Sequence, residues 1–369
     1  MQSPPLRVPY LFWAHTKSAR SPYCLSQSGM PLPDQAWLGD LSTLDVLSHP
    51  SIEALPALER RLAELFDVSP ERVLVTAGAS GAMLLAALRW FGPSARVAVE
   101  TPAYQSLAAV TERAGASRVP IERRPENGWQ PDPGQVESAL DGARPGHVFL
   151  TNPHNPTGAV SDAAMVQELA AVAGRADGIL LSCEVYMEYA TNEQRVHAAR
   201  LAPNAVSIGS LTKAYGLGPL RVGWMILGEG LVDQRESLID AAYLNYVDMP
   251  TVSLSLARRV LDDLPRFLGP LRRVEAESRP LFVEWLRTCP SIEAFEPEFG
   301  IYAFPRIRGV DDTQRLAEHL ALSCGVDVVP GEFFGRPGHL RVGCGVPVAT
   351  LQEGLARLTK GLAEYIPGA

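Results

Sequence analysis

One lysine of this sequence stands in a setting that suits covalent chemistry. Lys213 has no charged neighbour before Arg221, and small and hydroxyl residues surround it. Such an amine can form a Schiff base with a carbonyl group, while Ser210 and Arg221 can bind a phosphate. The glycines that follow allow the backbone to approach a bound group closely; they are Gly216, Gly218 and Gly223. Taken alone, this stretch is more typical of a strand, a polar turn and an exposed lysine, because short motifs are only hypotheses.

The elements that must position this lysine alternate between short apolar strands and helices. Alternating strands and helices predict an α/β fold with a mostly parallel sheet covered on both faces. Ligands of such sheets lie beyond the carboxyl ends of the strands. Strands are expected at 73–76, 96–100, 148–151, 179–182 and 205–208, and helices at 55–65, 81–90 and 162–173.

The rest of the chain predicts a smaller α+β domain. Helical patterns at 233–264 precede a mixed pattern at 268–287, and residues 1–35 indicate an irregular arm rich in Pro and Ser. We therefore expect an arm at 1–45 that joins the small domain, a large domain at 46–270 and a small domain at 271–369. In the small domain, strands are expected at 300–305, 326–329 and 340–343, and helices at 313–323 and 349–365.

Composition excludes several classes of protein. With 369 residues and a net charge of -8, the chain can form a two-domain enzyme but lacks the excess of Lys and Arg that nucleic-acid binding needs. Its five cysteines are odd in number and contain no C-x-x-C pair, which argues against a disulfide framework or a zinc site. No apolar stretch suggests a membrane span and no leader pattern is visible, so we expect a cytoplasmic protein.

The lysine segment resembles that of a known enzyme family. The stretch S-L-T-K-A-Y-G-L-G-P-L-R-V-G-W at 210–224 is similar to class I/II aminotransferases, the pyridoxal 5'-phosphate (PLP) enzymes of fold type I. Further motifs follow in the family's order through most of the chain. The resemblance implies a homodimer in which Lys213 binds PLP and an amino group moves between an L-amino acid and a 2-oxo acid. It implies no metal.

The resemblance also assigns residues to the cofactor's phosphate. Gly78, Ala79 and Ser80 lie between a predicted strand and a predicted helix, where unpaired amides favour an anion. With Ser210 and Arg221 they would form a phosphate site. Without the resemblance, Ser80 would be interpreted as an ordinary N-cap.

Other matched positions would hold the ring and the substrate. Tyr104 would stack on the pyridine ring and Tyr186 would bond its phenolic oxygen. Asn155, in the loop N-P-H-N-P-T-G at 152–158, would donate to that oxygen and help bind the substrate. Arg341 would bind the substrate's α-carboxylate, because its planar fork suits that group, with the backbone of Gly29 nearby. On their own, Tyr104 would indicate packing and Arg341 a surface residue.

Two positions depart from the family's pattern. Cys183 stands where the family has an aspartate that pairs with the pyridinium nitrogen, and a thiol is a weak hydrogen-bonding partner. The adjacent Glu184 would point to the opposite face of the strand. We therefore expect a weakened electron sink, which leaves open a lyase, a racemase, a biosynthetic PLP enzyme or a non-catalytic PLP-binding protein. A tyrosine that reaches the partner's phosphate is also missing, and either His49 replaces it or that contact is absent.

Overall fold

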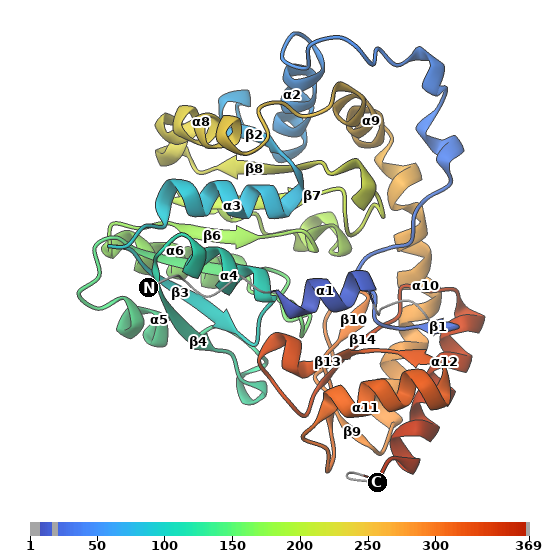
Figure 1. The fold of residues 1–369 in the computed structure, drawn as a ribbon. Coiled ribbons are helices and arrows are strands. Elements are labelled where there is room, and N and C mark those ends of the chain that lie inside the picture. The colour runs from blue at the N-terminus through green and yellow to red at the C-terminus, as the bar shows by residue number, and fades with distance from the viewer. Residues whose placement is uncertain (1–7, 17–20, 367–369) are drawn as a thin grey trace.

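The structure, a computed structural model, describes residues 8–16 and 21–366 and is built around a seven-stranded sheet (Figure 1). All neighbouring strands are parallel except those beside β8, which is antiparallel to both β7 and β2. The five predicted strands are confirmed to within two residues, whereas β8 and β4 were not predicted. In spatial order the strands are β2 (Val73–Thr76), β8 (Gly223–Leu227), β7 (Ala205–Ser210), β6 (Leu180–Cys183), β5 (Gly146–Thr151), β3 (Arg96–Thr101) and β4 (Ser117–Glu122).

Helices cover both faces of this sheet, as the alternating pattern predicts. On one face α3, α4 and α8 bury their apolar side chains against the strands, and on the other α5, α6 and α7 do so. Helices α2 and α9 pack against each other beside the β2 end of the sheet. The bounds are α2 (Ala54–Phe66), α3 (Gly78–Trp90), α4 (Gln105–Arg113), α5 (Pro133–Leu140), α6 (Ala163–Arg175), α7 (Ala198–Leu201), α8 (Arg235–Asn245) and α9 (Thr251–Asp262).

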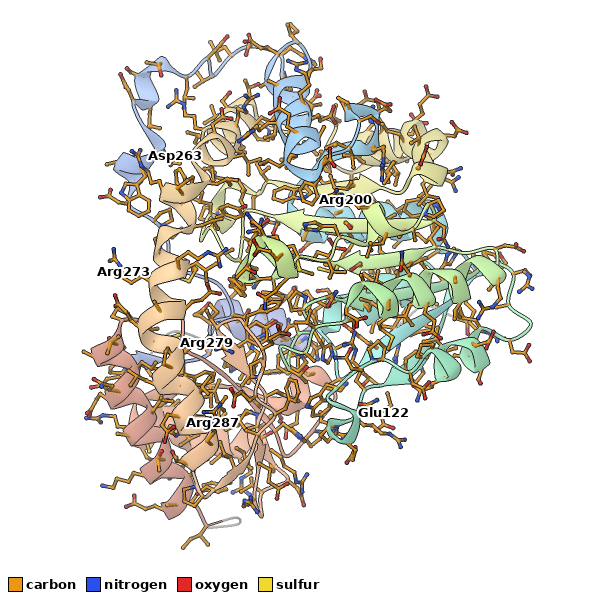
Figure 2. All side chains as sticks on the ribbon, turned by 180° about the vertical axis from the view of Figure 1, so that it is seen from behind. Glu122, Arg200, Asp263, Arg273, Arg279 and Arg287 are labelled. Atoms are coloured by element: carbon orange, nitrogen blue, oxygen red, sulfur yellow. The ribbon has the colours of Figure 1, made fainter. Side chains whose placement is uncertain are left out.

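The 25-residue helix α10 (Leu264–Thr288) links the large sheet to the C-terminal part. The sequence predicted only a mixed pattern here, because Pro270 and Pro280 interrupt a helical signal. Figure 2 shows Asp263, Arg273, Arg279 and Arg287 spaced along this helix. Arg287 near the end of α10 forms an ion pair with Glu296 at 2.8 Å, which connects the helix to the segment that follows it. The predicted boundary at 270 lies within this helix, and the division into domains remains a prediction.

Small sheets and two helices complete the C-terminal part. The order β10-β14-β13 forms one sheet, β11 pairs with β9, and β1 pairs with β12 in parallel. Strand β14 has the predicted bounds, but the predicted strands at 300–305 and 326–329 are shorter or divided, and the helix at 313–323 ends in a π-helical turn. The bounds are β1 (Tyr23–Cys24), β9 (Ile292–Glu293), β10 (Tyr302–Ala303), β11 (Arg306–Ile307), α11 (Thr313–His319), β12 (Val326–Asp327), β13 (Val329–Pro330), β14 (Leu340–Gly343) and α12 (Val348–Glu364).

The prediction of an irregular arm is wrong where α1 (Pro9–Thr16) forms. Tyr10 packs into a cluster with Phe304, Val329, Phe333 and Phe334. Tertiary packing rather than periodicity therefore stabilises this short helix. Residues 1–7 and 17–20 of the predicted arm lie outside the described residues. Within the described ranges, no helix is long and apolar enough to cross a membrane.

Candidate active site

A cavity of about 630 Å³ lies where β5, β6 and β7 end, between the start of α3 and helix α1. Three of the sequence-predicted site residues, Gly29, Gly78 and Arg341, do not line it. The others gather there from separate segments of the chain: Ala79, Ser80, Tyr104, Asn155, Cys183, Tyr186, Ser210, Lys213 and Arg221.

Lys213 lies at one end of a short polar chain that has Ser28 in its middle. Its amine Nζ donates to Ser28 Oγ at 3.2 Å, and Ser28 Oγ lies 3.0 Å from the hydroxyl of Tyr186. The amine also lies 5.6 Å from the centroid of the Tyr186 ring. The sequence contains only three lysines, and Lys213 is the one that lines the cavity in the described part of the chain. Ser28 was not predicted, although its neighbour Gly29 was.

Gly29 lies against the backbone of Lys213. The amide of Met30 donates to the carbonyl of Lys213 at 2.8 Å. A Cβ atom at Gly29 would lie 3.3 Å from Lys213 Cα, so a side chain there would crowd the lysine. The carbonyl that does contact Arg341 belongs to Ser26, at 3.0 Å from Nη2.

The start of α3 forms one end of the cavity. The helix begins at Gly78, three residues before the predicted start, so Ser80 lies in its first turn and is not an N-cap. No side chain caps the first amides at Ala77, which leaves the positive end of the helix dipole open to an anion. Arg221 adopts a left-handed conformation with φ 55, and its Nη2 donates to Ala77 O at 3.2 Å. A guanidinium therefore stands directly beside this helix start, and Ser210 adds a hydroxyl.

Asn155 turns its amide group toward the cavity. Arginine can only donate, so the Asn155 atom 3.0 Å from Arg341 Nη1 is the acceptor Oδ1, which leaves the NH₂ group for another partner. His154, to which the sequence assigns no role, holds this loop. Its Nδ1 lies 2.7 Å from Thr157 Oγ1, and its Nε2 lies 2.7 Å from Pro102 O. Burial lowers the pKa of His154 well below its usual value, and Arg123 adds to this effect, so the ring is neutral.

Arg341 is fully enclosed, with an exposed fraction of 1%. Its Nη2 donates to the hydroxyl of Tyr10 at 2.9 Å, and its Nε has no partner within the described residues. The rings of Phe334, Tyr10 and Tyr302 surround the guanidinium, with centroids 5.1, 5.5 and 5.8 Å away. The ring of Tyr10 also meets Tyr104 edge-on at 5.7 Å. Burial alone would raise the pKa of Tyr10, but the charges of Arg341 and Lys213 bring it below its usual value.

Cys183 lies at the end of β6 beside Thr151 of β5 and is almost completely buried. Burial raises the pKa of its thiol to about 12, with Glu100 and Glu184 adding to the effect, so the group is neutral. Glu184 points away as expected, and its carboxylate accepts from the Ser207 hydroxyl at 2.7 Å.

These residues fit PLP at two of its groups. The open helix start with Arg221 suits a phosphate, and the amine of Lys213 suits an aldehyde. Cys183, which the resemblance assigns to the ring nitrogen, would offer it a neutral thiol. No group of three or more His, Cys, Asp or Glu side chains could hold a metal ion within residues 8–16 and 21–366.

The sequence is similar to those of known proteins. The family model for aminotransferase class I and II matches residues 38–358. Capreomycidine synthase of Streptomyces vinaceus is 32% identical over 298 residues, which are 80% of this chain and 76% of the relative. Arginine–pyruvate transaminase of Pseudomonas aeruginosa is 30% identical over 322 residues, covering 84% and 81%.

Solved structures agree on the fold. A PLP-dependent aminotransferase from Streptococcus suis superposes with a TM-score of 0.86 at 25% identity, with 100% of both chains covered. An aspartate aminotransferase variant of Thermus thermophilus gives a TM-score of 0.80 at 24% identity, covering 91% and 95%. The chain belongs to the class I and II aminotransferases, a family of PLP-dependent enzymes of fold type I.

Proposed function

We propose that this protein is an aminotransferase that uses PLP to move an amino group between an L-amino acid and a 2-oxo acid. One observation carries the proposal: the only lysine lining the cavity, among the described residues, lies where three strands end and shares that cavity with the uncapped start of α3. Family membership and the transaminase among the relatives support the same reaction.

In this proposal Lys213 holds the cofactor covalently through its amine. The first amides of α3 at Gly78, Ala79 and Ser80, with Ser210 and Arg221, bind its phosphate. Tyr104 supports the ring, Asn155 and Tyr186 bond its phenolic oxygen, and Cys183 faces its nitrogen. Arg341 receives the substrate's α-carboxylate, with Gly29 setting the position of Lys213.

The proton transfer falls to Lys213. When bound, PLP supplies an electron sink that makes the α-proton of the amino acid acidic. Once the substrate's amino group has displaced it from the cofactor, the free amine of Lys213 would remove that proton from the α-carbon and return it to the carbon on the other side of the amino nitrogen, as a general base and acid. Ser28 lies 3.2 Å from this amine and holds its position in the cavity.

The reaction is tested by mixing purified protein, PLP, an amino acid and a 2-oxo acid, and following the new 2-oxo acid. The absorbance of bound PLP should change when the amino acid is added. Lys213→Ala should abolish both signals, whereas Lys360→Ala, which replaces a lysine exposed on α12, should leave both unchanged. Normal turnover by Lys213→Ala would overturn the proposal.

A second candidate is a different PLP reaction, such as a lyase or a biosynthetic step. Two observations favour it: the thiol of Cys183 is neutral, with a pKa raised to about 12 by burial, and a relative at 32% identity is named a synthase. Product analysis separates the two. An aminotransferase converts the amino acid to its 2-oxo acid and aminates the acceptor, whereas a lyase gives products without amination of any acceptor.

We further infer a homodimer. The exposed apolar side chains at 46–52 and 243–247, named here the apolar edge, include Leu47 and Leu244, whose exposed fractions are 92% and 89%. A contiguous apolar surface of this kind marks an interface. The two segments lie near each other in the fold, since the hydroxyl of Thr251, which follows the second segment, donates to Ser48 O at 2.8 Å. The apolar edge consists of Val46, Leu47, Ile52, Tyr243, Leu244 and Val247.

Light scattering tests the dimer. The native protein should show twice the 39.9 kDa mass of the chain, and Leu47→Asp with Leu244→Asp should halve it. Leu322→Asp, at another exposed leucine, is the control.

His49 contributes no cofactor contact in this proposal, because its ring nitrogens lie near Ser51 Oγ at 2.8 Å and Asp248 at 3.5 Å.

The five free cysteines support a reducing compartment such as the cytoplasm.

A further inference from the structure

Helix α1 forms one wall of the cavity. Tyr10, Trp13 and Ala14 follow one another at i, i+3 and i+4, so they share a face of the helix. The rings of Tyr10 and Trp13 stack with centroids 6.3 Å apart. Leu11 adds apolar surface beside them, and Trp13 is braced from behind by Phe333 at 5.5 Å. Tyr10, Leu11, Trp13 and Ala14, named here the α1 wall, therefore form an apolar and largely aromatic surface, and the exposed His15 of the same helix lines the cavity beside it.

The α1 wall is anchored at the place where a substrate carboxylate would bind. The hydroxyl of Tyr10 lies 2.9 Å from Arg341 Nη2, and the amide of Tyr10 donates to Gln105 Oε1 at 2.8 Å. A substrate whose carboxylate approaches Arg341 therefore has Trp13 and Leu11 close to its side chain.

The charges of the cavity do not match a charged side chain. None of the described residues that line it is Asp or Glu, so a guanidinium or ammonium group would find no carboxylate there. Of the described residues, one arginine and one lysine line the cavity, Arg221 and Lys213, and both belong to the proposed cofactor site. Burying an unpaired charge is costly, whereas burying apolar surface against an aromatic wall is favourable.

Resting on the proposed function, we infer that the α1 wall selects the substrate, and that the substrate is an amino acid with a large, uncharged, apolar side chain, aromatic or branched aliphatic. Trp13 is then a specificity-determining residue. The names of the relatives point instead to arginine and aspartate, so the inference separates this chain from them.

Carboxylates that lack an amino group test this inference without turnover. Dissociation constants are measured by calorimetry on the PLP-loaded protein for 3-phenylpropanoate, 5-guanidinopentanoate and butanedioate. We expect 3-phenylpropanoate to bind at least tenfold more tightly than the other two. Trp13→Ala should weaken it about tenfold and Trp13→Phe much less. The control is Phe12→Ala, on the same helix with 69% of its side chain exposed, which should change it less than twofold.

Tighter binding of either charged carboxylate, or equal losses in Trp13→Ala and Phe12→Ala, would overturn the inference. Its failure is distinct from failure of the proposed function. If the protein transfers an amino group from an L-amino acid but prefers substrates with a charged side chain, only the inference about the α1 wall is refuted. If no amino group is transferred, the function fails, while the dissociation constants still decide the specificity.

Discussion

The guanidinium of Arg341 donates to the hydroxyl of Tyr10 across 2.9 Å, although the two residues are 331 positions apart in the chain. The other bonds of Arg341 go to Asn155 Oδ1 and Ser26 O, each at 3.0 Å. Its hydrogen-bonding groups are therefore mostly engaged before any substrate arrives. A carboxylate that binds two adjacent donors must take the place of one partner of Nη2, either the Tyr10 hydroxyl or Ser26 O, and we expect the side-chain hydroxyl to be the one that moves.

Tyr10→Phe removes this competitor. A hydrogen bond to a charged group contributes ~1.5 kcal/mol, so the substrate should bind about tenfold more tightly without it. We expect KM for the amino acid to fall by up to that factor while kcat stays nearly constant, whatever the substrate's side chain. Steady-state kinetics measure both constants. An unchanged or higher KM would show that the hydroxyl positions Arg341 instead of competing.

Cys183→Asp should restore a negative charge beside the ring nitrogen. A charge-assisted hydrogen bond there contributes ~1.5 kcal/mol or more, so kcat for amino transfer should rise at least about tenfold. Cys183→Ser is the matched control, because it keeps a neutral group of similar size and should leave kcat within a few-fold. If the aspartate variant gains no transfer activity and loses another reaction, the second candidate function is supported.

Gly78→Ala should separate backbone strain from cofactor binding. Gly78 has φ +72, and a Cβ there would lie 2.5 Å from Arg221 Nη2, so the arginine must move. Gly142 has φ +67 with nothing within 4 Å of the added atom. Both substitutions should lower the free energy of unfolding by about 1 kcal/mol through the left-handed backbone.

Only Gly78→Ala should weaken PLP binding, because only it displaces the predicted phosphate-binding arginine. Thermal unfolding measures the first effect, and titration of the apoprotein with PLP measures the second. Equal PLP affinity in the two variants would remove Arg221 from the phosphate site.

Stability should fall in mild acid because of three buried histidines. Burial lowers the pKa of His147 to about 4 and that of His339 to about 4, and burial together with the charge of Arg123 lowers the pKa of His154 well below its usual value. These rings stay neutral in the folded protein but take up protons near pH 6.5 when it unfolds. Their contribution to stability is therefore full above pH 6.5 and is lost as the pH falls toward 4.

Glu100 has the opposite effect on stability. Burial raises the pKa of its carboxyl to about 7, although the charge of Arg123 lowers it. The contribution of Glu100 to the free energy of unfolding is therefore lost as the pH rises through 7. Burial also raises the pKa values of Glu59 and Glu275, which act in the same direction as Glu100, so the difference in slope between the wild type and a histidine variant isolates the contribution of that histidine. Denaturant titrations between pH 4 and 6.5 measure the slope, and His147→Phe should reduce it by about 1 kcal/mol per pH unit. An unchanged slope in that variant would contradict the assignment.

Local signals predicted the strands well. Strands β2 and β14 have the predicted bounds, because short apolar runs beside polar turns form strands regardless of distant context. Helix α10 was missed because two prolines obscure its pattern, and α1 because packing alone stabilises it.

The candidate site was predictable only where a motif marks it. Lys213 and Asn155 lie within such motifs and both line the cavity. Ser28 and Tyr10 carry no local signal, since their partners Lys213, Tyr186 and Arg341 come from segments between 158 and 331 residues away. Chain folding, and not sequence spacing, brings these groups together.

The pairing of β1 with β12 sets an order for the folding of the growing chain. Tyr23 lies opposite Val326, so the start of the chain completes a sheet whose other strand is made near the end of synthesis. During translation the large sheet can form as soon as β8 has left the ribosome, whereas β1 must wait about 100 residues longer for its partner. The amino-acid site that we propose between α1 and β14 would therefore be completed only by the last part of the chain to leave the ribosome.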